Sequence, residues 1–125
     1  MKHLEKIITK ELLRKVLPKE TENLSEYFSF YIDDDDYIVF RDEGETLFDY
    51  NIYKFAFKCK EYVLNKGYIL SSNNYSNGGC CQVIQQNGEE CPECGECTTF
   101  EFIHSFTEIE AIIKATNSIS LKEDS

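Results

Sequence analysis

The chain has 125 residues, of which 42% are hydrophobic, so it is long enough for one compact core and too short for two ordinary domains. Its 13 basic and 23 acidic residues give a formal net charge of −10. This charge repels phosphate backbones and anionic lipids, which argues against direct nucleic-acid binding and against membrane binding. A basic protein face is electrostatically compatible, although an acidic surface more often serves solubility alone.

The N-terminal residues 1–19 carry charges throughout, so they contain neither the apolar core of a secretion signal nor a membrane span. We therefore expect a cytoplasmic protein. In a reducing cytosol, clustered cysteines are metal ligands or free thiols more often than disulfides, and a bridged secreted domain would require that a signal had been removed.

The first third of the chain predicts a helix and a hairpin. Apolar residues recur at helical spacing over 4–17, Thr9 is placed to cap or restart this helix midway, and Pro18 is expected to end it. After a polar connector at 19–25, the aromatic and β-branched runs 27–32 and 37–41 predict two strands. The aspartates Asp33 to Asp36 form the solvated tip between them, because they lack the ligand spacing of a calcium loop.

The longest helix is expected over 50–66, after a polar run at 42–45. Its buried stripe consists of Ile52, Phe55, Ala56, Cys59, Tyr62 and Val63, with Cys59 as a small buried hydrophobe, and Gly67 is placed to take the left-handed conformation that ends a helix. A short strand at 68–72 and a loop at 73–79 follow.

The last third predicts a hairpin of strands 81–85 and 98–105, then a final helix. Thr107 and Glu110 have the spacing of a capping box, and Phe106 is placed to staple the first turn. The buried stripe of this helix is expected to be Ile109, Ile112, Ile113, Thr116 and Ile119. Because the elements show no regular βαβ alternation, we expect a single α+β domain over 1–125: an antiparallel sheet of about 4–5 strands covered by helices, with a Cys-rich hairpin extension at 80–98.

Five of the six cysteines lie between Cys80 and Cys97, and three of them stand in the run Cys91-Pro92-Glu93-Cys94-Gly95-Glu96-Cys97. Structural zinc takes four thiolate or imidazole ligands, commonly from two short clips. Cys91 with Cys94 makes one clip, and Cys97 with Cys80 or Cys81 the second. The adjacent cysteines 80 and 81 point to opposite strand faces, so at most one of them should bind. His104 is expected to be packed or solvated.

Three other interpretations of the cluster stay open. The spacing also opens an iron–sulfur run, but the fourth cysteine of that pattern is missing. Cys91 and Cys94 have the spacing of a thiol–disulfide enzyme, whereas the neighbouring glutamates favour the neutral thiol over the reactive thiolate. Unligated thiols or a disulfide are the simplest alternative. We expect zinc in a structural role, since no general base or second shell for a catalytic metal is evident.

Aromatic residues are numerous between Tyr27 and Phe57. A base-stacking surface would need cationic side chains beside the rings, and we expect these aromatics to form the core instead. With two histidines in the chain, no nucleophile, base and orienting acid can be assembled.

Several segments resemble a group of small, uncharacterised phage and prophage proteins. They are Ile8–Leu13, Asn51–Tyr62, Lys66–Tyr68 and Thr107–Ala115. The resemblance implies an intracellular, phage-related accessory protein in the host cytoplasm, and it transfers neither an activity nor site residues. An extended cysteine knuckle would be an addition to the pattern of that group.

Together these observations predict a non-enzymatic binding or regulatory module with a structural zinc-knuckle-like hairpin, no catalytic residues and an unidentified protein partner. The alternatives are a thiol–disulfide redox protein using Cys91 and Cys94, and an acidic decoy for a cationic, DNA-binding protein. The sequence does not indicate an oligomeric state.

Overall fold

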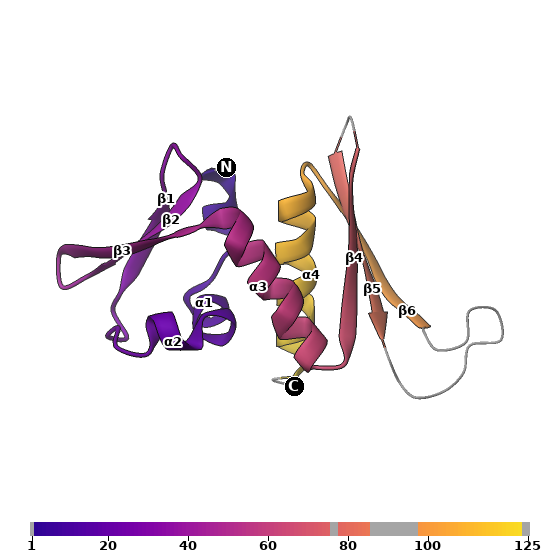
Figure 1. Ribbon diagram of the computed structural model, residues 1–125, viewed down its shortest axis with the longest axis horizontal. Helices are drawn as coiled ribbons and strands as arrows, with labels where there is room; N and C mark the ends of the chain where they lie inside the picture. The colour runs from indigo at the N-terminus through magenta and orange to yellow at the C-terminus, as the bar shows by residue number, and fades with distance from the viewer. Residues whose placement is uncertain (1, 76–77, 86–97, 124–125) are drawn as a thin grey trace. The chain divides into compact units, whose positions relative to one another are not determined.

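A computed structural model describes residues 2–75, 78–85 and 98–123 of the chain (Figure 1). The expected α+β class is confirmed. The chain divides into two compact units, Met1–Lys58 (unit 1) and Cys59–Ser125 (unit 2).

Unit 1 begins with three short helices where the sequence predicted one. They are the 3₁₀ helix η1 (Lys2–Lys6), α1 (Lys10–Val16) and α2 (Pro18–Thr21). Thr9 interrupts the series in an extended conformation, and its hydroxyl accepts a hydrogen bond from the Leu12 amide at 3.0 Å, so it caps α1 as its position suggested. α1 ends at Val16 with Leu17 as its C-cap, directly before Pro18, so the proline closes this helix as expected. Pro18 also opens α2, where its missing N–H costs nothing.

Three antiparallel strands form the sheet of unit 1 in the order β1-β2-β3. The predicted hairpin is confirmed as β1 (Ser29–Ile32) and β2 (Tyr37–Asp42). The third strand, β3 (Glu45–Asn51), was not predicted and occupies residues that the sequence assigned to a connector and to the start of a helix. Glu43 and Gly44 join β2 to β3 with φ of 54° and 80°, as a two-residue hairpin turn requires.

Aromatic packing forms the centre of the unit 1 core. The Phe40 ring stacks on Phe48 at 4.5 Å between centroids and lies 6.2 Å from the Phe28 ring. Phe28 and Phe40 are fully buried, together with Leu4, Leu12, Leu13, Leu17, Ile32 and Ile38.

Polar side chains hold the irregular connections of unit 1. The Arg14 guanidinium donates to the backbone carbonyls of Thr21, Leu24 and Ser25 at 3.1, 3.2 and 2.9 Å. Ser25 in turn donates from its amide and hydroxyl to the Asp42 carboxylate at 2.8 and 2.6 Å. The non-helical segment between α2 and β1 is therefore tied to α1 on one side and to the end of β2 on the other.

Helix α3 (Ile52–Asn65) starts in unit 1 and ends in unit 2. Its predicted stripe is confirmed for Ile52, Phe55, Ala56, Cys59 and Val63, which are buried, while Tyr62 is half-buried. Gly67 has the expected positive φ, at 92°, and its amide donates to the Leu64 carbonyl at 3.1 Å.

Unit 2 contains a second three-stranded antiparallel sheet, with strand order β4-β5-β6. The strands are β4 (Tyr68–Tyr75), β5 (Gly78–Gln85) and β6 (Thr98–Ser105). Pairing of β5 with β6 confirms the predicted legs of the hairpin. β4 is longer than expected, because Asn73 to Tyr75 continue the pairing into residues predicted as a loop.

Helix α4 (Glu108–Glu123) covers one face of this second sheet and contacts all three of its strands (Figure 1). Thr107 caps it as predicted, accepting from the Glu110 amide at 3.1 Å. The predicted staple is wrong, because the Phe106 side chain is 85% exposed. The first turn of α4 instead lies against Gly79, where an added Cβ would fall on the Glu108 amide nitrogen and 2.5 Å from the Glu108 Cα.

The described strands thus form two sheets of three strands, and the expected single sheet of about 4–5 strands is not found. Two residues account for the difference. Asn51 ends β3 and is followed at once by α3, and Gly67 follows α3 directly before β4. The three strands that precede α3 in the chain form one sheet, and the three that follow it form the other. That residues 1–125 fold as one domain stays a prediction, which unfolding measurements address.

None of the helices in the described part of the chain has the length and apolar character needed to span a bilayer.

Candidate functional site

A groove of about 420 Å³ lies on the surface of unit 1 where β3 meets α3. Its lining consists of three aromatic and two lysine side chains: Tyr50, Tyr53, Lys54, Phe57 and Lys58. We call this surface the aromatic–lysine groove.

The junction between β3 and α3 builds the groove. Tyr50 is held at the end of β3 by pairing with Ile38, and the next residue, Asn51, pairs with Tyr37. The Asn51 side chain then accepts from the amides of Tyr53 and Lys54 at 2.9 and 3.2 Å, which makes it the cap of α3. Strand and helix are therefore joined without a linker, and the lining residues of both are fixed by backbone hydrogen bonds.

The spacing along α3 sorts the lining residues into two rows. Tyr53 and Phe57 are four residues apart, as are Lys54 and Lys58, so each pair lies on one side of the helix, one turn apart. The Tyr53 and Phe57 side chains are 54% and 62% exposed, although both are large and apolar. The groove thus has an aromatic row beside a cationic row.

This arrangement corrects the expectation that the aromatics of this region form the core. Phe28, Phe40 and Phe55 are fully buried, as expected, but Tyr53 and Phe57 are exposed. The premise that no lysine or arginine lies beside the exposed rings was also wrong, because Lys54 and Lys58 line the same groove. The signal was present in the sequence, since positions 53 and 57 fall between the members of the buried stripe and so on the opposite side of the helix.

Of the five predicted zinc ligands, the structure describes Cys80 and Cys81, neither of which forms a disulfide with another described residue. They are adjacent in β5, and both are buried. Burial raises the pKa of the Cys81 thiol to about 12, with the Lys60 charge acting in the opposite direction. The choice between Cys80 and Cys81 as the fourth ligand stays open. In the strand register Cys80 stands opposite His104.

Cys91, Cys94 and Cys97 lie outside the described residues, and so does the tip of the predicted hairpin at 80–98. Among the described residues, no three His, Cys, Asp or Glu side chains are grouped as a metal site would need. The pairing of Gln85 with Thr98 places the two ends of segment 86–97 on neighbouring strands. The zinc site stays a prediction, as do the iron–sulfur, redox and free-thiol alternatives.

A polar cluster lies close to Cys81 in unit 2. The Ser72 hydroxyl accepts a hydrogen bond from the Lys60 ammonium at 2.8 Å and donates one to the Glu108 carboxylate at 2.6 Å. Ser72 is also the register partner of Cys81. The cluster therefore links α3, β4 and α4. Because the Ser72 hydroxyl already donates one hydrogen bond and accepts another, the cluster has a structural role and offers no activated nucleophile.

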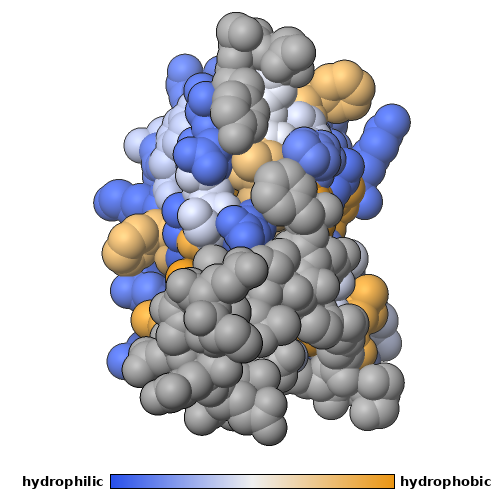
Figure 2. Space-filling view, turned by 90° about the vertical axis from the view of Figure 1, so that its right-hand side faces the viewer, coloured by the Kyte–Doolittle hydropathy of each residue, from blue (hydrophilic) through white to orange (hydrophobic). Residues whose placement is uncertain are grey.

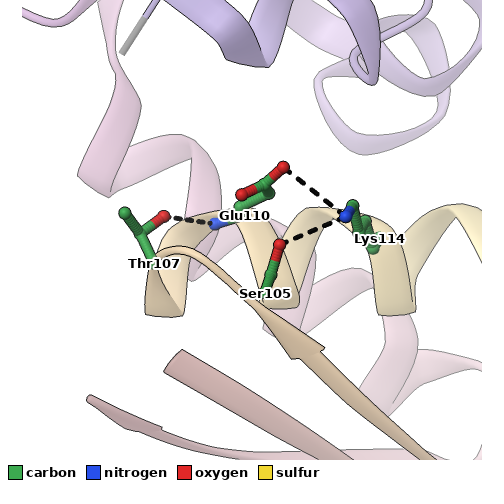
Figure 3. A network of polar contacts seen from close by, with 4 residues as sticks. All are labelled: Ser105, Thr107, Glu110 and Lys114. Atoms are coloured by element: carbon green, nitrogen blue, oxygen red, sulfur yellow. Dashed lines mark hydrogen bonds and ion pairs between the residues drawn. The ribbon is translucent and has the colours of Figure 1, made fainter. Parts of the chain in front are cut away.

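A second cluster surrounds the cap of α4 (Figure 3). The Lys114 ammonium lies 3.5 Å from the Glu110 carboxylate and donates to the Ser105 hydroxyl at 3.2 Å. Burial acts to raise the pKa of Glu110, but hydrogen bonding to Ser105 and the charge of Lys114 outweigh it and leave this pKa below its ordinary value. Glu110 is thus held ionised where α4 meets β6.

The side of the molecule shown in Figure 2 presents mainly hydrophilic side chains among the described residues, with hydrophobic ones in separate areas. Comparison of the chain with protein-family models, curated proteins and solved structures found no match. The phage-type accessory role implied by the resemblance stays a prediction, and the groove is the candidate site on which a functional proposal can be based.

Proposed function

We propose that the protein is a non-catalytic binding module that docks a segment of a protein partner in the aromatic–lysine groove. The observation that carries the proposal is the exposure of Tyr53 and Phe57 on one side of α3. Exposed aromatic side chains gathered over a groove are typical of protein interaction sites, where rings supply much of the binding energy. The occupant is an extended or helical segment that inserts an apolar side chain between the rings.

The energetic gain from covering the groove is adequate for a specific interaction. Burying the exposed half of one ring is worth about 2 kcal/mol at 25 cal/mol per Å² of apolar surface, before the costs of association. Two rings and the aliphatic stems of two lysines would therefore support a weak to moderate affinity, which suits a regulatory module.

Selection from a display library of short random peptides tests this proposal. The wild-type chain and the double variant Tyr53→Ser/Phe57→Ser are used as parallel baits, with Tyr27→Ser as a control at an exposed tyrosine away from the groove. We expect peptides that bind the wild type and the control and bind the double variant about tenfold more weakly. Peptides that bind all three baits equally would refute the groove as the docking site.

We further propose that a structural zinc ion orders the hairpin tip, with Cys91, Cys94 and Cys97 as ligands and Cys80 or Cys81 as the fourth. Support comes from the ligand spacing and from the strand pairing that brings the ends of segment 86–97 together. Elemental analysis of protein purified without chelator, with thiol counting on the same sample, tests it. One zinc per chain is expected, and a metal-free sample with titratable thiols would refute it.

A further inference from the structure

We propose that the segment docked in the aromatic–lysine groove comes from a basic protein partner. It inserts an apolar side chain between the rings and carries lysine or arginine on the side that faces residues 33–36, which we call the acidic turn. This inference rests on the proposed function and concerns the chemistry of the partner. It follows from the apolar lining of the groove and from the position of the acidic turn.

The lining of the groove selects an apolar anchor. Its surface is almost wholly apolar, although two of its five residues are lysines. Lys54 and Lys58 therefore contribute mainly the aliphatic parts of their side chains, and Lys58 is already engaged in an interaction within the chain. The side chain that enters the groove is accordingly uncharged, and any preference for charge arises outside the lining.

The acidic turn adjoins the start of α3 (Figure 1). The Asp36 carbonyl accepts a hydrogen bond from the Ile52 amide at 3.0 Å, and Tyr37, the residue after the turn, pairs with Asn51. Tyr53, which lines the groove, follows Ile52 directly. A segment that passes over Tyr53 toward the start of α3 therefore approaches the carboxylates of the turn.

The four aspartates of the turn have different roles. Asp33 uses its carboxylate within the turn, where it accepts from the Asp35 and Tyr37 amides at 3.0 and 2.9 Å. Asp34 and Asp35 are exposed. A lysine or arginine placed beside them gains Coulomb energy, whereas an aspartate or glutamate is repelled. Because salt screens such interactions beyond about 10 Å, the preference belongs to the end of the groove next to the turn.

The net charge of the chain acts in the same direction. At −10 it attracts a basic segment, and it repels an acidic peptide, a second copy of the chain and a nucleic-acid strand alike. The field of the whole chain raises the rate of encounter with basic partners, whereas the acidic turn sets where the basic residues lie relative to the anchor.

The main experiment uses a peptide enriched against the wild type in the library selection. It is synthesised with its basic residues intact and with each replaced by glutamine, and both forms are titrated against three proteins: the wild type, Asp34→Asn/Asp35→Asn, and the control pair Glu20→Gln/Glu22→Gln. The control residues are exposed, lie in the same unit outside the groove lining and the acidic turn, and change the net charge equally. Asp33 is kept because its carboxylate holds the turn together.

We expect the basic form to bind the wild type and the control about fivefold more tightly than the glutamine form. This preference should fall to about twofold or less in Asp34→Asn/Asp35→Asn, and it should weaken as the salt concentration rises from about 0.1 M to about 1 M. An equal preference in both variants would attribute the effect to net charge alone and overturn the inference.

Other outcomes separate this inference from the function on which it rests. Equal binding of the two peptide forms to the wild type, or enrichment of peptides without basic residues, would overturn the inference and leave the docking function intact. A selection without groove-dependent peptides refutes the docking function itself.

Two alternative occupants are tested directly. Analytical ultracentrifugation compares the wild type with Phe57→Ser, and a dimer that dissociates in the variant would assign the groove to self-association. An oligothymidylate that binds the wild type and is lost in Phe57→Ser would assign it to single-stranded nucleic acid. Either result would overturn the inference.

Discussion

Each unit contains a three-stranded antiparallel sheet, but the two sheets are stabilised in different ways. In unit 2 one long helix, α4, covers all three strands, and the strand pairing runs through eight consecutive partners from Tyr68 to Tyr75. Apart from the start of α3, the described helices of unit 1 are short, and side chains such as Arg14 and Asp42 bind the backbone of its connections. Regular packing stabilises unit 2, whereas unit 1 depends on individual polar contacts around an aromatic core.

The difference has a functional counterpart. The aromatic–lysine groove lies in unit 1, where β3 turns directly into α3. Substitutions in each unit therefore test whether the units are stabilised separately.

Phe40→Ala is expected to have the largest effect. Removing a fully buried ring that contacts Phe28 and Phe48 should destabilise unit 1 by about 3–5 kcal/mol. Hydrogen exchange followed by NMR would locate the loss. Faster exchange confined to residues 2–58 would sharpen the comparison, whereas an equal loss in α4 would mean that the units unfold together and that residues 1–125 behave as one domain.

Gly79→Ala makes the corresponding change in unit 2. Its new methyl group would collide with the backbone of Glu108, which no rotamer change can relieve, so we expect a loss of about 3 kcal/mol. Urea unfolding gives the value. Gly67→Ala is the control, because it meets no atom within 4 Å and is disfavoured only by its positive φ, at about 1 kcal/mol. Equal costs at the two positions would contradict the close packing of α4 on β5.

Arg14→Leu tests the polar contacts of unit 1. Three backbone carbonyls would lose a charged donor, and we expect a loss of about 2 kcal/mol by thermal or urea unfolding. Arg14→Lys keeps the charge and loses the fork of donors, so it should recover only part of the stability. Full recovery with lysine would show that charge alone, rather than the carbonyl contacts, stabilises the connection.

The helix caps offer a matched pair with a smaller effect. Thr9 and Thr107 each accept one amide hydrogen bond at the start of a helix, at 3.0 and 3.1 Å. Replacing either by alanine should cost about 1 kcal/mol. Because the geometry is the same, a much larger effect of Thr107→Ala would indicate that the long helix transmits the loss of its cap to the whole sheet.

The pH dependence is the smallest expected effect. Hydrogen bonds from Ser25, first from its side chain and then from its backbone, lower the pKa of Asp42 below the ordinary value of 3.8. A carboxyl group with a lowered folded-state pKa stabilises the protein above its unfolded pKa, and this contribution disappears as the pH falls through the folded pKa. The melting temperature of the wild type should exceed that of Asp42→Asn at neutral pH and approach it below about pH 4. A constant difference would contradict the role of the charge.

Sequence reasoning succeeded where one pattern determines the element. The alternating residue types in 98–105 predicted β6, and the threonine three residues before Glu110 predicted the start of α4. It failed for β3, whose residues Glu45 to Asn51 are mostly exposed or half-buried on both faces. β3 forms because its backbone pairs with that of β2. The amino-acid composition of β3 alone does not reveal this pairing.

The candidate site was missed for a related reason. The stripe from Ile52 to Val63 was read correctly, but Tyr53 and Phe57 were assigned to the core by residue type rather than by helical position. The groove also needs Tyr50 from β3, so it could not be assembled until that strand was known.

The direct passage from β3 into α3 has a consequence for the rate at which a partner leaves. Since Asn51 belongs to the ladder and caps the helix, the two walls of the groove cannot swing apart to release a bound segment. The receptor side is preorganised and loses little conformational entropy on association, so differences in residence time among partners should arise from how readily each peptide orders itself.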